Sequence, residues 1–223
     1  MIKLRAASAP GFIDTTGDLK RGIRALRRTC PDMRRIHDLT GDPPLRRYEP
    51  GFEGLARIVI GQQLSISSAE AIWARTRLTV TPFEARSLMS LDDATLQAAG
   101  LSRGKIRTLR ALAERIAAGS LVVESLVTSS EADAHAALTA VPGIGPWTAD
   151  IFLLFCAGRA DAWASGDLAL QVAVQWMLDL ESRPRPNELT EIAERWRPQR
   201  ATAARLLWAY YRIAKEARSG EAI

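Results

Sequence analysis

The sequence predicts an all-α fold, and three observations support this prediction. Apolar residues recur at the three- and four-residue spacing of amphipathic helices through most of the 223-residue chain. Helix start signals and glycine or proline stops separate these segments at short intervals. The two strand-like segments, residues 78–80 and 121–123, have no partner at hairpin spacing.

The N-terminal part is expected to form two short helices, over residues 18–29 and 31–39. A Gly-Asp-Pro-Pro break at residues 41–44 follows them, because proline and glycine interrupt helices. The apolar segment at residues 52–64 predicts the next helix. Residues 1–20 contain no continuous apolar segment, so a cleaved secretion signal is not expected.

Capping patterns locate the helices in the middle of the chain. Residues 67–70 and 81–84 both match the capping box, in which serine or threonine precedes glutamate by three residues. The second box predicts a helix that ends at Gly100. Ser102 then caps another helix, whose apolar stripe spans residues 106–116.

The C-terminal half continues as helices separated by short breaks. An Arg-Pro-Arg-Pro segment at residues 183–186 is the clearest of these breaks. The expected helices span residues 131–140, 147–157, 168–180, 187–196 and 199–218.

Composition limits the functional classes. The net charge is +5, and residues 1–50 carry this excess with 11 basic and 6 acidic side chains, which favours a polyanionic partner. The only cysteines, Cys30 and Cys156, exclude a disulfide framework, a four-thiolate zinc site and an iron–sulfur cluster. The longest apolar run, residues 151–157, is too short to span a membrane. A reducing cytoplasm and no membrane partner are therefore expected.

The sharpest motif is the string Val-Pro-Gly-Ile-Gly-Pro-Trp-Thr-Ala-Asp at residues 141–150. Gly143 ends one helix, and Pro146 is tolerated in the first turn of the next. Two helices are thus joined by a tight turn whose glycines allow close approach of a ligand. The amides and dipole of the second helix favour an anion, so Gly143, Gly145 and Thr148 are candidate contacts to a phosphodiester.

Asp167 lies twenty residues after Trp147, immediately before an amphipathic helix. Aspartate commonly caps a helix at this position without any chemistry. Such a carboxylate is also well suited to stabilise a cationic transition state. Beside the hairpin motif, the catalytic role becomes the favoured one.

The hairpin and the downstream Asp167 resemble the helix-hairpin-helix DNA glycosylase superfamily, and within it the AlkA-type 3-methyladenine glycosylases. Three further segments carry the resemblance. Residues 52–65 contain a Gln-Gln pair, residues 100–105 precede a helix, and residues 194–208 resemble the C-terminal helices of that group. Together these motifs cover residues 42–212.

The resemblance implies two helical lobes around a DNA-binding cleft. The central lobe would span residues 50–158 and end in the helix-hairpin-helix motif. The second lobe would combine residues 1–49 with residues 159–223. The chain resembles the short form of the family, which has no additional N-terminal β domain.

The resemblance also implies a monofunctional glycosylase of base excision repair that acts as a monomer on double-stranded DNA. Asp167 would assist hydrolysis of the N-glycosidic bond of a flipped-out alkylated purine, such as 3-methyladenine or 7-methylguanine. These purines are cationic and leave easily, so neither a general acid nor a cofactor is required. Bifunctional relatives carry a lysine at the position of Trp147, whereas no lysine lies between Lys105 and Lys215. Strand cleavage through a Schiff base is therefore disfavoured.

Further site residues follow from the resemblance. The base pocket would be lined by Trp147, Trp208 and Ile151, the last where relatives carry tyrosine. Gln62 and Gln63 would contact DNA, although polar residues at a helix end need no such role. The side chain that fills the gap left by the flipped base would be Leu101, Ser102 or Arg103. Backbone carbonyls of Thr139, Val141 and Ile144 would hold a monovalent cation, sodium or potassium.

Alternatives remain for the other tryptophans and for the function. Core packing is the expected role of Trp73, Trp176 and Trp196, and Trp163 is undecided. The chain could instead be a glycosylase for a neutral lesion, such as hypoxanthine, uracil or an oxidised purine. It could also be a helix-hairpin-helix protein that binds DNA without chemistry.

Overall fold

The computed structural model describes residues 11–220, which are helical and contain no β-strand. The predicted all-α class is therefore confirmed. Contacts divide the chain into two units: unit 1 combines Met1–Arg47 with Gly158–Ile223, and unit 2 is Tyr48–Ala157. Residues 1–10 and 221–223 lie outside the described residues. Both ends belong to the expected terminal lobe, and residues 1–10 are also half of the N-terminal segment in which no secretion signal was expected.

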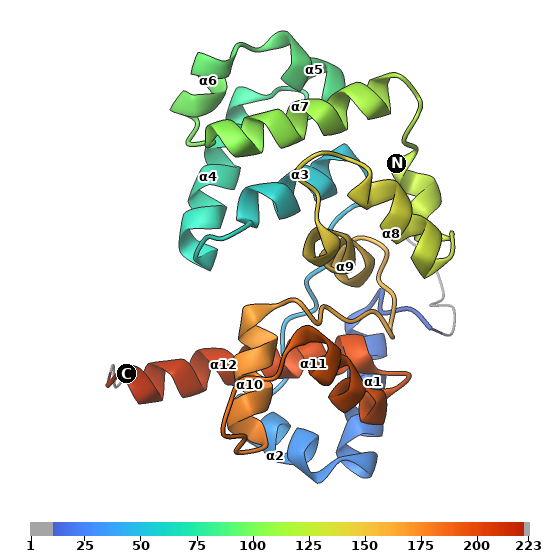
Figure 1. Ribbon diagram of the computed structural model, residues 1–223, viewed down its shortest axis with the longest axis vertical. Coiled ribbons are helices and arrows are strands. Elements are labelled where there is room, and N and C mark those ends of the chain that lie inside the picture. The colour runs from blue at the N-terminus through green and yellow to red at the C-terminus, as the bar shows by residue number, and fades with distance from the viewer. Residues whose placement is uncertain (1–10, 221–223) are drawn as a thin grey trace. The chain divides into compact units, whose positions relative to one another are not determined.

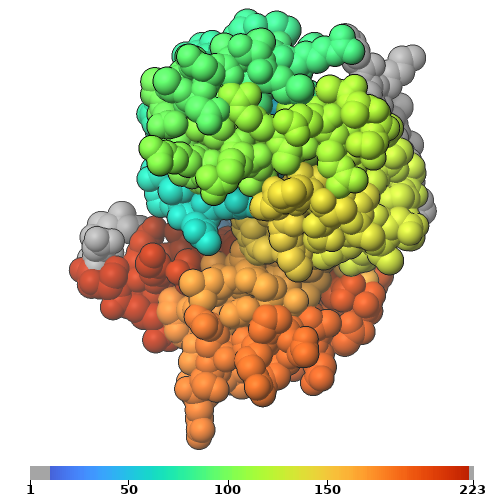
Figure 2. Space-filling model, turned by 45° about the horizontal axis from the view of Figure 1, so that its top comes forward, coloured from blue at the N-terminus to red at the C-terminus, as the bar shows by residue number. Residues whose placement is uncertain are grey.

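Unit 2 is organised around its first helix, α3 (Phe52–Gly61), which is buried along most of its length. This helix packs against α4, α7 and α9. The helices that follow it are α4 (Ile66–Thr79), α5 (Ala85–Ser90), α6 (Asp93–Ala98), α7 (Arg103–Ala117), the 3₁₀ helix η1 (Val123–Val127), α8 (Glu131–Thr139) and α9 (Pro146–Phe155). α5 and α6 pack on α7 (Figure 1), and in Figure 2 this green segment forms a continuous outer surface.

Two predicted helix starts in unit 2 are wrong. The hydroxyl of Ser65, not Ser67, accepts a hydrogen bond from the amide of Ser68 at 3.2 Å and caps α4. Several serines compete for this role, and the sequence does not rank them. The hydroxyl of Thr81 donates to the carbonyl of Leu78 at 3.1 Å instead of capping a helix.

Gly100 follows the end of a helix, as expected, and the segment before it forms two helices, α5 and α6. The break arises at Asp92, whose carboxylate accepts a hydrogen bond from the amide of Thr95 at 2.8 Å. This contact starts a new helix, as an N-cap aspartate does. The cap predicted at Ser102 is confirmed, since its hydroxyl accepts from the amide of Lys105.

Unit 1 is built on α12 (Arg200–Ser219), whose first eight residues are buried. Its other helices are α1 (Thr16–Thr29), α2 (Pro31–Thr40), α10 (Leu168–Met177), α11 (Pro186–Ala193) and the short 3₁₀ helix η2 (Glu194–Trp196). α12 packs against α10, α2 and α1. Gly22 allows α1 to pack closely on α12, because a Cβ at this position would lie 2.3 Å from Oγ1 of Thr202 on α12. None of the helices in the described part is long and apolar enough to cross a membrane.

Candidate functional site

In unit 1, Asp167 is the N-cap of α10. Its Oδ1 accepts hydrogen bonds from the amide of Leu170 and from the indole Nε1 of Trp208, each at 3.0 Å. The backbone of Asp167 is also fixed, because its amide donates to the carbonyl of Ala164 at 3.0 Å. Both Asp167 and Trp208 are partly exposed. The carboxylate is therefore oriented by two helices and remains accessible.

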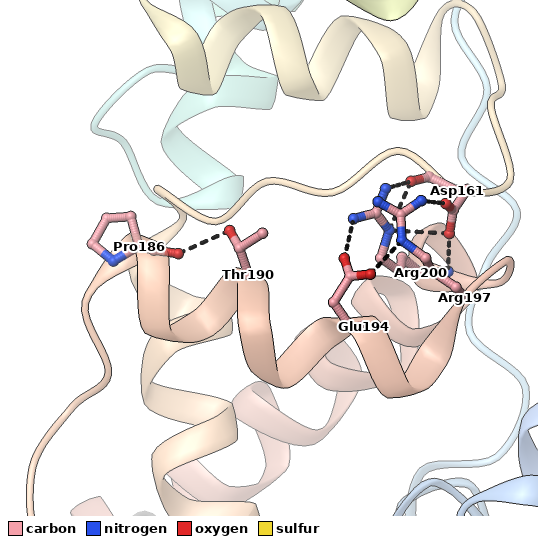
Figure 3. Close-up of polar contacts among 6 residues, drawn as sticks. All are labelled: Asp161, Pro186, Thr190, Glu194, Arg197 and Arg200. Atoms are coloured by element: carbon pink, nitrogen blue, oxygen red, sulfur yellow. Dashed lines mark hydrogen bonds and ion pairs between the residues drawn. The ribbon is translucent and has the colours of Figure 1, made fainter.

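An ion-pair cluster fastens the segment that leads to Asp167 onto the start of α12 (Figure 3). The buried guanidinium of Arg200 donates to the carboxylate of Asp161 at 3.0 Å and to its backbone carbonyl at 2.7 Å. Arg197 pairs with Asp161 and with Glu194, and Arg200 also pairs with Glu194. The cluster thus ties the loop before α10 to the helix that carries Trp208.

Gln171 secures the other side of the same loop. This side chain is 7% exposed, and its amide nitrogen donates to the carbonyl of Ser165 at 2.9 Å. Sequence reasoning missed both Gln171 and the cluster around Asp161, because neither belongs to a motif. The available hint was a glutamine among the apolar residues of the first turns of α10, since a polar group that becomes buried requires a partner.

The remaining tryptophans are mostly structural. Trp73 and Trp196 are buried, as expected, and Trp163 packs on Trp196 with ring centroids 5.4 Å apart. Trp176 is only partly buried and stacks on Tyr211 at 5.6 Å, so the core role expected for it is wrong.

In unit 2, α8 and α9 form the predicted hairpin around Gly143 and Gly145. Gly143 has φ +86°, and an added Cβ would lie 1.9 Å from Oγ1 of Thr108 on α7. Gly145 is the N-cap of α9 and has no atom within 4 Å of an added Cβ. Neither glycine amide donates a hydrogen bond within residues 11–220. Two exposed amides therefore lie at the start of α9, as a phosphate site requires.

The first turn of α9 carries three of the predicted residues. Trp147, the second residue of α9, is partly exposed. Thr148 and Ile151 are 2% and 5% exposed, so both belong to the packed side of the helix. The hydroxyl of Thr148 therefore faces protein rather than an open phosphate site.

Gln62 and Gln63 have different environments. The amide nitrogen of Gln62 donates to Oγ1 of Thr148 at 2.9 Å and to the carbonyl of Gly143 at 3.3 Å, so it supports the hairpin. Gln63 is exposed and has φ +56°, a left-handed conformation that is uncommon for glutamine. Gln63 is one of the residues that line a hollow of about 450 Å³.

This hollow is lined by both glutamines and by two other candidate residues, Ser102 and Gly143. The lining residues that sequence reasoning did not assign to the site are Gly104, Lys105, Arg107, Thr108 and Pro142. Nζ of Lys105 donates to the carbonyl of Ile60 at 2.6 Å and thus joins α7 to the end of α3. Burial lowers the pKa of Lys105. Lys105 lies inside the segment 100–105 that carries the family resemblance, and its position one turn after Ser102 was the available hint.

The three candidates for insertion into DNA are placed differently. Leu101 is 3% exposed and belongs to the core of unit 2. Ser102 is exposed but serves as the N-cap of α7. Arg103 is exposed at the first position of α7. As placed, Leu101 would have to leave the core in order to intercalate.

His135 and Asp150 link the two helices of the hairpin. Nε2 of His135 on α8 lies 2.7 Å from Oδ1 of Asp150 on α9. Burial raises the pKa of Asp150 to about 6, and the hydrogen bond to His135 opposes this shift. This contact joins α8 to α9 within the hairpin.

The carbonyls expected to hold a cation lie at the end of α8 and in the turn. The carbonyl of Val141 accepts from the amide of Ile144 at 3.0 Å. Within residues 11–220, the carbonyls of Thr139 and Ile144 accept no backbone hydrogen bond other than those internal to a helix. Carbonyl oxygens of this kind suit a hard cation, so the donor set fits. No group of three histidine, cysteine or acidic side chains that could bind a metal lies within residues 11–220.

Comparisons with known proteins agree with this geometry. The family model described as "HhH-GPD superfamily base excision DNA repair protein" matches residues 56–199. DNA-3-methyladenine glycosylase 1 of Schizosaccharomyces pombe is 29% identical over 177 residues, which are 76% of each chain. A probable bifunctional transcriptional activator and DNA repair enzyme AlkA of Mycobacterium tuberculosis is 30% identical over 88% of this chain, which spans 40% of that relative.

Solved structures support the fold. The S. pombe 3-methyladenine DNA glycosylase in complex with abasic DNA has a TM-score of 0.78 at 24% identity. The match covers 87% of this chain and 97% of that one. At this identity, the similarity establishes the architecture only.

Proposed function

Because the chain belongs to the HhH-GPD superfamily and is a base excision DNA glycosylase, we propose that it releases alkylated purines from duplex DNA with Asp167 as its catalytic carboxylate. The substrates would be bases of the 3-methyladenine and 7-methylguanine type. The observation that carries this proposal is the double anchoring of Asp167 Oδ1 by Leu170 and Trp208. A helix cap alone does not need a tryptophan donor from a different helix.

The chemistry is hydrolysis at C1′ of the damaged nucleotide. As the C1′–N bond breaks, its electron pair leaves with the base, and the sugar gains positive charge. Asp167 stabilises this cation and orients the water that adds to C1′. The water proton passes to the carboxylate or to solvent. Because an alkylated purine leaves as a neutral base, no general acid is needed.

Aromatic side chains would supply selectivity for cationic bases. Trp147 and Trp208 are both partly exposed in their own units. An aromatic face attracts a cation with about 0.5–2 kcal/mol. This attraction favours alkylated purines over normal ones without a hydrogen-bond code. A neutral lesion would need dedicated donors, and none was recognised in the sequence.

The hairpin would hold the DNA backbone through the amides of Gly143 and Gly145. The carbonyls of Thr139, Val141 and Ile144 would hold a monovalent cation that adds positive charge for phosphate binding. No lysine lies between Lys105 and Lys215, so we expect base release without strand cleavage. The chain would act as a monomer.

The test is release of free base from a methylated duplex, with a separate alkali step that reveals abasic sites. Asp167→Asn should abolish release and retain DNA binding, because asparagine caps a helix as well as aspartate does. Asp92→Asn is the matched control, since Asp92 caps α6 in the same way at an exposed position. Activity in Asp167→Asn would refute the assignment.

A second assay separates the alternative functions. Methylated and deaminated duplexes compete for the wild-type protein, and release of the methylated base should dominate. Preferential release from the deaminated duplex would indicate a glycosylase for neutral lesions. Binding without release from either duplex would indicate a non-catalytic DNA-binding protein.

A further inference from the structure

Four arginines surround a hollow at the corner between α1 and α2 in unit 1. Arg24, Arg27 and Arg28 belong to the last turns of α1, and Arg34 belongs to α2. They line a hollow of about 330 Å³, and all except Arg27 are highly exposed. We call these four residues the arginine corner. The proposed base release uses none of them.

The arginine corner is poorly neutralised. Arg27 forms an ion pair with Asp38, and its Nη1 lies 2.8 Å from Nδ1 of His37. Within residues 11–220, the guanidinium groups of Arg24, Arg28 and Arg34 form no ion pair. Neighbouring like charges destabilise the folded state unless an anion binds among them.

Helix capping accounts for only part of this charge. Nε of Arg34 donates to the carbonyl of Arg27 at 2.9 Å, at a helix end where the dipole favours a cation. Arg24 lies one turn earlier, where this effect has faded. Neither Arg24 nor Arg28 donates a hydrogen bond to protein in the described part of the chain. Their charges are therefore free for an external anion.

The position of the corner separates it from the catalytic carboxylate. Within unit 1, the junction of α1 and α2 lies at the opposite end from the start of α10, which Asp167 caps (Figure 1). A phosphate bound at the corner is consequently not that of the reacting nucleotide. Guanidinium groups bind phosphate in a bidentate manner, and duplex DNA carries a negative charge about every 1.7 Å along its axis.

We propose that the arginine corner is a second binding site for the phosphates of undamaged duplex DNA. This inference rests on the proposed function, because duplex DNA is the polyanion that such an enzyme searches. A protein that holds a second duplex before it releases the first transfers directly between DNA segments. An acidic protein segment carries the same charge, but it lacks the regular array of phosphates along which the exposed side chains of Arg24, Arg28 and Arg34 could bind.

The test compares two triple variants of equal charge. The corner variant is Arg24→Gln/Arg28→Gln/Arg34→Gln. The control is Arg86→Gln/Arg183→Gln/Arg195→Gln, which removes exposed arginines that are scattered over the chain. Dissociation from a labelled undamaged duplex is measured as unlabelled undamaged duplex is added. Arg28→Gln alone serves as a milder variant, because this side chain has no partner in the described residues.

Direct transfer makes dissociation faster as competitor concentration rises. We expect this acceleration for the wild type and the control, and a constant rate for the corner variant. For binding of the second duplex, the slope of log affinity against log salt should fall by about 1 for Arg28→Gln, whereas the affinity for the first duplex should change little in either variant. Base release from a methylated duplex of about one helical turn should stay within about twofold of the wild type for the corner variant.

Four outcomes decide the proposal. Unchanged acceleration in the corner variant would overturn it, and so would an equal loss in the control variant. Loss of binding to poly-glutamate with DNA transfer intact would assign the corner to an acidic protein and overturn it as well. If the wild type releases no base but transfers between duplexes, and the corner variant does not transfer, the proposed function fails while the second DNA site is supported.

Discussion

The indole Nε1 of Trp208 donates a hydrogen bond to Oδ1 of Asp167 at 3.0 Å, so α12 orients the N-cap of α10. A side chain 41 positions further along the chain therefore helps to orient the Asp167 carboxylate. The ion pairs of Arg200 with Asp161 fix the start of α12 to the loop that precedes Asp167. Damage to either contact should therefore misorient the carboxylate without removing it.

Trp208→Phe should separate the hydrogen bond from the aromatic face. Phenylalanine keeps a ring but has no donor, and a hydrogen bond to a charged group contributes about 1.5–3 kcal/mol. We expect single-turnover base release to fall about tenfold or more while DNA affinity changes little. Trp176→Phe is the control, because Trp176 stacks on Tyr211 and lies near the opposite end of α10 from its N-cap, Asp167. Equal rates in the two variants would show that the indole donor is dispensable.

Replacing the two hairpin glycines with alanine should change stability to very different extents. Gly143→Ala places a methyl group 1.9 Å from Oγ1 of Thr108 at φ +86°, and we expect a loss of about 2–4 kcal/mol in unfolding free energy. Gly145→Ala meets no atom within 4 Å and has an ordinary φ of −96°. Its stability should change by less than about 1 kcal/mol. Urea denaturation measures both, and similar midpoints would contradict the close packing of the turn on α7.

The adjacent glutamines should separate stability from binding. Gln62→Ala leaves the buried hydroxyl of Thr148 without its donor, so the unfolding free energy should fall by about 1–2 kcal/mol. Gln63→Asn keeps a residue that tolerates the left-handed conformation. It should preserve stability and weaken DNA binding, because the shorter side chain reaches less far from the exposed position that follows α3. Denaturation and fluorescence anisotropy test the pair, and the reverse assignment of effects would refute it.

The sequence predicts local features, such as helix caps, better than contacts between residues on different helices. The cap at Ser102 was predictable, because one serine precedes a clear apolar stripe. The cap of α4 was not, since three serines, Ser65, Ser67 and Ser68, compete for this role. The role of Asp167 as an N-cap was visible, but no periodicity indicates that Trp208 donates to it from another helix. The excess charge of residues 1–50 was likewise evident, whereas its convergence at Arg24, Arg28 and Arg34 depends on how α1 and α2 pack.

Asp150 should make the stability of the hairpin depend on pH. Burial raises the pKa of Asp150 to about 6 from 3.8, so the folded protein retains this proton at a pH where the unfolded chain has lost it. Unfolding free energy should therefore fall as pH rises from about 4 to about 6, by up to about 3 kcal/mol, and stay low above that range. Asp150→Asn removes the titration, so its stability relative to wild type should improve across this window.

The measurement is the urea midpoint of wild type and Asp150→Asn at several pH values between about 4 and about 7.5. Asp179→Asn is the control, because Asp179 is exposed and asparagine suits its φ of +52°. Its profile should run parallel to that of wild type. A parallel profile for Asp150→Asn would mean that Asp150 ionises without penalty and that the contact with His135 offsets its burial.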